Sequence, residues 1–68
     1  MHTILGLDIS TSITGATVIR DGKILETVFW DTRNKRKFPT FYEKAEFIKE
    51  KILTIKNNHD INSIYIEQ

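Results

Sequence analysis

The stretch ILGLDISTSITGATVIRDG, residues 4–22, decides the fold. Residues 3–8 are β-branched and apolar with little alternation, which predicts a strand buried on both faces and ending in a single carboxylate, Asp8. Residues 15–20 predict a second strand. Asp21-Gly22 is a strong hairpin signal, because both central positions of a type I′ turn need a positive φ. With residues 23–31 as a third strand, the sequence predicts an antiparallel meander.

The third strand divides its side chains between the two faces of the sheet. One face receives Ile24, Glu26, Val28 and Trp30, and the other receives Leu25, Thr27, Phe29 and Asp31. Because Phe29 and Trp30 take opposite faces, one of the two rings can be exposed and can stack on a nucleic-acid base. Packing within the sheet is the favoured interpretation for these rings and for Tyr65.

A helix and a fourth strand complete the predicted fold. Thr40 and Glu43 form a capping-box pattern, and apolar residues then recur at helical spacing to an end near residues 57–58: Phe41, Ala45, Ile48, Ile52 and Ile55. Residues 63–67 read as a buried strand. A right-handed helical crossover can place this strand parallel to the first. The predicted class is therefore α/β, with the order β-β-β-α-β and one crossover helix.

Two acids end the two strands that are predicted to be parallel neighbours. Neighbouring strands lie about 4.8 Å apart, so Asp8 and Glu67 are expected to meet at one end of the sheet. The carboxyl ends of parallel strands are where α/β sheets commonly bind ligands. Two close carboxylates repel unless a cation bridges them, and Mg²⁺ is commonly held by one or two carboxylates plus water and phosphate oxygens. This pattern predicts a metal site that can serve phosphodiester cleavage.

Length and composition set further bounds. The chain has 68 residues, no cysteine and a net charge of +1, which indicates one domain without a disulfide framework. No apolar run is long enough to span a membrane, so a cytoplasmic protein is expected. A core strand at the end of the chain leads us to expect the N-terminal piece of a longer protein.

Several motifs together resemble the N-terminal half of the RuvC-like Holliday junction resolvases, in the ribonuclease H-like superfamily. They are LGLD at residues 5–8, DISTSITG at residues 8–15, the Asp21-Gly22 hairpin and the terminal IEQ. The resemblance implies that residues 1–68 are the first portion of a ribonuclease H-like nuclease domain, with Asp8 and Glu67 as catalytic Mg²⁺ (or Mn²⁺) ligands. It also implies a homodimer of the full-length protein that acts on branched DNA in recombination and repair. A bacterial and a viral origin both stay open.

The chain departs from that family in two ways. The family often has glycine two residues after the first acid, where this chain has Ser10. Family members also carry two further acids near the end of a later helix, and this region is not in the chain. We therefore expect the 68 residues alone to have little or no activity.

Two polar segments are candidate contacts for phosphate or DNA. The turn after Asp8 offers hydroxyl groups from Ser10, Thr11, Ser12 and Thr14, although an ordinary polar turn is the slightly favoured interpretation. The loop after the third strand is dense in cations: Arg33, Lys35, Arg36 and Lys37. Such a cluster suits salt-sensitive phosphate contacts, and it also suits a solvated loop. His2 and His59 are isolated, and no metal role is assigned to them.

Three alternative functions stay open at this stage. Sugar kinases and actin-like ATPases open with a similar strand, acid and hydroxyl-rich turn that binds nucleotide phosphates, but the terminal IEQ fits the nuclease better. The YqgF-like nucleases that process ribosomal RNA precursors share the same opening. The third alternative is a non-catalytic fragment that binds nucleic acid through the basic loop, and open sheet edges can also make the chain self-associate.

Overall fold

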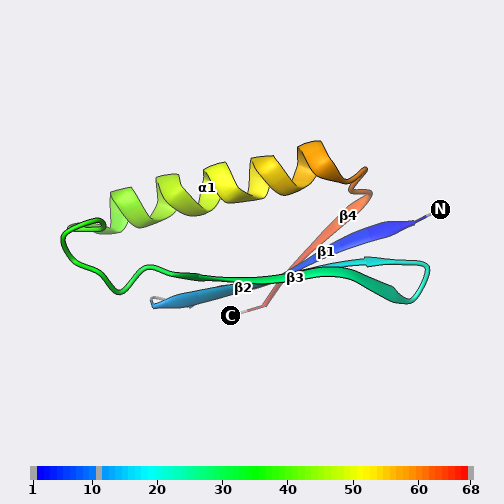
Figure 1. The fold of residues 1–68 in the computed structure, drawn as a ribbon, viewed down its shortest axis with the longest axis horizontal. Coiled ribbons are helices and arrows are strands. Elements are labelled where there is room, and N and C mark those ends of the chain that lie inside the picture. The colour runs from blue at the N-terminus through cyan, green and yellow to red at the C-terminus, as the bar shows by residue number, and fades with distance from the viewer. Residues whose placement is uncertain (1, 11, 68) are drawn as a thin grey trace.

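The computed structural model describes residues 2–10 and 12–67 as a four-stranded sheet with one helix packed on one face (Figure 1). The elements are β1 (Thr3–Asp8), β2 (Ile13–Arg20), β3 (Lys23–Asp31), α1 (Phe41–Asn58) and β4 (Ser63–Glu67). The strand order is β3-β2-β1-β4, with β4 parallel to β1 and the other pairs antiparallel. The predicted α/β fold and its order of elements are confirmed.

The core lies between α1 and the first three strands. Leu5, Leu7, Ala16, Val18 and Ile55 form the buried cluster. In β1, burial alternates from residue to residue, since Thr3, Leu5 and Leu7 are buried while Asp8 on the other face is exposed. The prediction that β1 is buried on both faces is therefore wrong, because the structure has no layer over the second face within the described residues.

The β2–β3 hairpin follows the predicted turn and contains one irregularity. Asp21 and Gly22 both have positive φ, 51° and 81°, as a type I′ turn requires. The register then shifts between Val18 and Ile19, which pair with Glu26 and Ile24. The extra residue moves Ile24 to the face of Ile19, and Ile24 is 67% exposed. The predicted placement of Ile24 with Glu26, Val28 and Trp30 is wrong for this reason.

Helix α1 has the caps that the sequence predicts. The Thr40 hydroxyl accepts a hydrogen bond from the Tyr42 backbone N–H, and the Glu43 carboxylate accepts from the Thr40 backbone N–H at 2.9 Å. At the other end, the His59 N–H donates to the Ile55 carbonyl, and the His59 ring nitrogen Nε2 lies 2.9 Å from Glu26 Oε2 on β3. These contacts fix both ends of the helix, and they give His59 a structural role.

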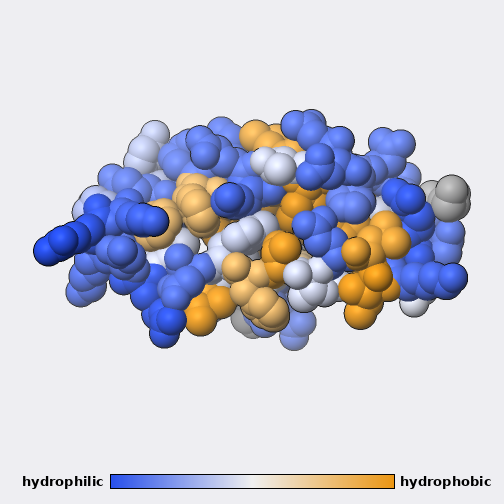
Figure 2. Space-filling view, viewed as in Figure 1, coloured by the Kyte–Doolittle hydropathy of each residue, from blue (hydrophilic) through white to orange (hydrophobic). Residues whose placement is uncertain are grey.

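Strand β4 is far more exposed than its sequence suggests. Ile64, Tyr65 and Ile66 are 45%, 71% and 60% exposed, so the predictions of a buried strand and a packed Tyr65 are wrong. The cause is the position of β4 at the edge of the sheet, beyond the strands that α1 covers. Figure 2 shows hydrophobic residues at the surface below the polar outer side of α1. Among the described residues, no helix is long and apolar enough to cross a bilayer.

Candidate functional site

Asp8 and Glu67 are direct neighbours across the β1–β4 pair. The two residues are register partners at the carboxyl ends of parallel strands, and the Ile9 N–H extends the ladder with a 3.1 Å hydrogen bond to the Glu67 carbonyl. Both side chains are exposed and lie on the sheet face away from α1. The predicted adjacency of these two strand ends is confirmed.

The two carboxylates line one shallow hollow of about 330 Å³ on this open face. Gly6 and Gly15 line its base and carry no side chains that would fill it. The rest of the lining comes from all four strands: Leu7, Thr17, Phe29, Tyr65 and Ile66. The hollow therefore contains the Asp8–Glu67 pair, the aromatic rings of Phe29 and Tyr65, and two glycines at its base.

This donor set suits a hard divalent cation. Carboxylate oxygens are the ligands that Mg²⁺ prefers, and one or two of them suffice where water and substrate phosphate complete the shell. Within residues 2–10 and 12–67, no group of three or more His, Cys, Asp or Glu side chains gathers at one place. A cation bound here would have Asp8 and Glu67 as two carboxylate ligands, and water, phosphate oxygens or further protein groups would fill its remaining positions.

The hydroxyl-rich turn is directed elsewhere. The Ser10 hydroxyl accepts from the backbone N–H groups of Ser12 and Ile13 and donates to the Ile13 carbonyl, which makes it part of the turn itself. Thr14 is 2% exposed on the face toward α1. Thr11 lies outside the described residues. The structure thus does not bring Ser10 and Thr14 to the acidic pair, and their phosphate contacts stay a prediction.

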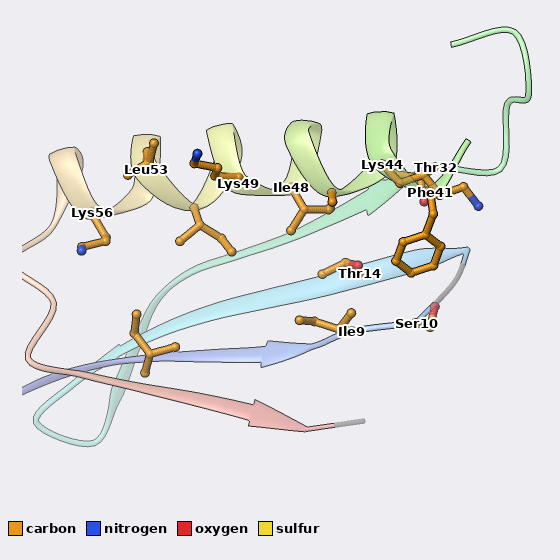
Figure 3. A pocket seen from close by; sticks show the side chains of 13 residues that line it. Ile9, Ser10, Thr14, Thr32, Phe41, Lys44, Ile48, Lys49, Leu53 and Lys56 are labelled. Carbon is orange, nitrogen blue, oxygen red and sulfur yellow. The ribbon is translucent and has the colours of Figure 1, made fainter. Parts of the chain in front are cut away.

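Ser10 and Thr14 instead line a groove of about 440 Å³ between α1 and the sheet (Figure 3). Its wall on α1 is formed by apolar side chains with lysines among them: Phe41, Lys44, Ala45, Ile48, Lys49, Ile52, Leu53 and Lys56. Ile9, Thr32 and Ile64 complete the sheet side. The groove is thus a second, mainly apolar surface, separated from the acidic pair by the sheet.

The basic loop leaves the sheet at the same end as the two acids. β3 runs parallel to β1, because both are antiparallel to β2, so the loop after Asp31 begins at the end that carries Asp8. Arg33 forms an ion pair with Asp31 at 2.6 Å, and the hydrogen bonds from Arg33 lower the pKa of the Asp31 carboxyl to about 2. Lys35, Arg36 and Lys37 are exposed.

One aromatic contact holds this loop against the helix. Phe38 packs edge-on against Phe47 of α1, with ring centroids 5.0 Å apart, and Phe38 is buried. The loop is therefore anchored at its far end while its cations face solvent.

The sequence interpretation left open that Phe29 or Trp30 is exposed but favoured packing for both, and it missed the exposure of Tyr65. Phe29 is 72% exposed and Tyr65 is 71% exposed. The signal for Phe29 was its position opposite to Trp30, which packs toward the core. For Tyr65, the only indication was the position of its strand at the edge of the sheet, where β4 pairs with β1 on one side and has no partner on the other among the described residues.

Comparisons with protein-family models, with curated proteins and with solved structures found no match to this chain.

Proposed function

We propose that this chain provides the first two metal ligands of a divalent-metal-dependent endonuclease that acts on branched DNA. The observation that supports this function best is the pairing of Asp8 with Glu67 at the ends of adjacent parallel strands. The β-β-β-α-β mixed sheet agrees with the RuvC-like resemblance of DISTSITG and IEQ, although Gln68 lies outside the described residues. Under this proposal the chain is part of a ribonuclease H-like nuclease domain.

Asp8 and Glu67 have the metal-binding role in this proposal. Asp8 and Glu67 hold Mg²⁺ (or Mn²⁺), and the ordered β1–β4 ladder sets the spacing of their carboxylates. When bound, the ion supplies Lewis-acid stabilisation of the scissile phosphate and lowers the pKa of the attacking water. The chain carries two of the four acids that the family uses, so we expect it to have little or no activity by itself.

DNA binding is assigned to the basic loop at the same end of the sheet. Lys35, Arg36 and Lys37 offer cations to phosphates, while Arg33 is engaged by Asp31. Binding of this kind weakens with increasing salt, because it releases counterions. A homodimer suits symmetric cleavage of a four-way junction, and this assembly is part of the proposal.

The metal site can be tested by amide NMR during a titration with Mg²⁺ or Mn²⁺. We expect shifts concentrated at Asp8, Ile9 and Glu67. Asp8→Asn should remove this response and keep the fold, whereas Asp60→Asn, an exposed acid in the α1–β4 loop, should change neither. Equal shifts at every acid would contradict the metal site. ATP-induced shifts confined to residues 9–15 would favour the kinase-like alternative.

The substrate class can be tested with a labelled four-way junction, a linear duplex of the same sequence and a structured RNA. We expect the chain to bind the junction most tightly in Mg²⁺, and any cleavage to depend on Asp8 and Glu67. Preference for RNA would favour the RNA-processing alternative. Equal, metal-independent binding of all three probes would favour a non-catalytic nucleic-acid-binding fragment.

A further inference from the structure

The open face of the sheet carries two large aromatic rings that the core does not use. Phe29 on β3 and Tyr65 on β4 are 72% and 71% exposed, and both line the hollow that contains Asp8 and Glu67. Figure 1 shows α1 on the opposite face of the sheet. These rings contribute little burial to the fold, and their exposure leaves them accessible to a partner on this face.

Strand register places the rings at opposite corners of a small array. One row across the sheet reads Phe29, Gly15, Asp8 and Glu67, and the adjacent row reads Thr27, Thr17, Gly6 and Tyr65. The Phe29 ring lies over Gly15, since a Cβ built there would be 3.2 Å from the ring. Gly15 is therefore covered by the Phe29 ring. Gly6 leaves the surface next to Tyr65 open, since a Cβ built there would meet only the Thr17 carbonyl oxygen at 3.9 Å.

The distance between the two rings sets how they can act. Phe29 and Tyr65 are three strand spacings apart and offset by one row, so their Cα atoms are roughly 16 Å apart. This distance is too long for both rings to sandwich one flat ligand. Each ring instead offers a stacking surface of its own. Asp8 and Glu67 lie in the same row as Phe29, and Glu67 is on the same strand as Tyr65.

We propose that the open face binds an unpaired nucleic-acid strand, with one base stacked on Phe29, another on Tyr65, and the backbone between them crossing the Asp8–Glu67 pair. This inference rests on the proposed function, because a divalent ion at the pair offsets the repulsion between carboxylates and phosphates. Aromatic side chains bind unpaired bases in this way with little sequence preference. Paired bases in a duplex keep their faces stacked inside the helix, so the site selects unpaired strands.

The chemistry of the face favours a nucleic-acid strand over an apolar protein helix. The rest of the array consists of two glycines, the hydroxyls of Thr17 and Thr27, and the two carboxylates. An apolar helix on this surface would bury Asp8 and Glu67 without partners, which is costly. A strand with a bridging cation leaves both carboxylates satisfied and still covers the rings.

The test is fluorescence anisotropy of a labelled oligothymidylate with the full chain in Mg²⁺. Phe29→Leu and Tyr65→Leu should each weaken binding roughly tenfold, from the usual contribution of one stacked base. Phe41→Leu and Tyr42→Leu are matched controls, because these residues are 73% and 70% exposed at the start of α1. They should leave binding unchanged, and Phe29→Tyr, which keeps a ring, should retain it.

Two results would overturn the inference. One is equal binding by all four leucine variants, with circular dichroism showing that each is folded. The other is binding of a linear duplex as tight as that of the unpaired strand.

A second variant separates this inference from the metal site. The double substitution D8N/E67Q removes the repulsive charges, so this chain should bind the oligonucleotide in EDTA and still lose roughly tenfold on addition of F29L. If the NMR titration shows no metal site but this dependence persists, the stacking site stands while the nuclease proposal fails. If the metal shifts appear but F29L has no effect, the stacking site is wrong and the metal site stands.

Discussion

The two faces of the sheet are built from alternate residues of the same strands, yet their surroundings differ sharply. Toward α1, Leu5 and Val18 are 0% and 1% exposed, while on the open face Phe29 and Tyr65 remain more than two thirds exposed. The covered face stabilises the fold. The open face brings together groups that are of little use to stability: two carboxylates, two glycines and two rings. Stability and candidate function are thus separated by strand alternation, and each can be altered without the other.

The largest expected effect on stability comes from comparing the covered and open faces at two neighbouring residues in β1. Leu5→Ala should lower the free energy of unfolding by about 2–5 kcal/mol, because it leaves a cavity under α1. Ile4→Ala truncates a side chain of similar size on the open face, where Ile4 is half-buried. It should lower the free energy of unfolding clearly less. Urea denaturation followed by circular dichroism measures both. Equal losses would show that the open face is as well packed as the core. If Leu5→Ala is unfolded in buffer, Leu5→Val gives the milder comparison.

The covered face depends on α1, and the helix depends on its N-cap. Thr40→Ala should cost about 1 kcal/mol, because the Tyr42 N–H loses its hydroxyl acceptor. Thr54→Ala is the matched control: this exposed hydroxyl donates to the Glu50 carbonyl within the helix, and alanine has the higher helix propensity. Its thermal midpoint should stay unchanged or rise. If the thermal midpoint of Thr54→Ala fell as much as that of Thr40→Ala, the cap hydroxyl would have no special role in stability.

The next test concerns the contact between the turn after β1 and the end of β3. Thr32 is 2% exposed, and its hydroxyl and N–H both donate to the Ser12 carbonyl, at 3.1 and 2.8 Å. Thr32→Val should cost about 0.5–1.5 kcal/mol, since one bond is lost and the N–H bond remains. Thr27→Val makes the same change on the open face, where it should be nearly neutral in the same urea experiment. A neutral Thr32→Val would mean that the backbone bond alone holds the turn.

Much of the fold was predictable because its signals are local. The Asp21-Gly22 turn, the Thr40–Glu43 box and the helix end near residues 57–58 each depend on neighbours within a few residues. The bulge opposite Val18 was not predictable, because it depends on how two strands fit over the core. Exposure of β4 was missed for a similar reason: its apolar run reads the same whether or not another layer covers it.

The candidate site was predictable only in part. Adjacency of Asp8 and Glu67 followed from the element order, which requires a crossover between parallel strands. The position of Thr14 did not, because Asp8 pairs with Gly15, and this register turns Thr14 to the opposite face. No local pattern sets that register. The exposure of Tyr65 was missed, and that of Phe29 was not the favoured interpretation, because the position of a strand in the sheet decides which side chains are covered.

The smallest expected effect concerns a charge at the end of the open face, where Asp31 has a partner. The Arg33 guanidinium holds the pKa of the Asp31 carboxyl at about 2, below its ordinary value of 3.8. A carboxyl whose pKa is lower in the folded chain stabilises the fold above pH 3.8 and loses this contribution as the pH falls through about 2. Arg33→Gln should therefore return the pKa of Asp31 toward 3.8, as measured by carboxyl carbon NMR. The variant should be slightly less stable at neutral pH and equal to the parent at the acid end, and Lys35→Gln should change neither quantity. If the pKa of Asp31 stays low without Arg33, the ion pair is not its cause, and the strand end itself must stabilise the charge.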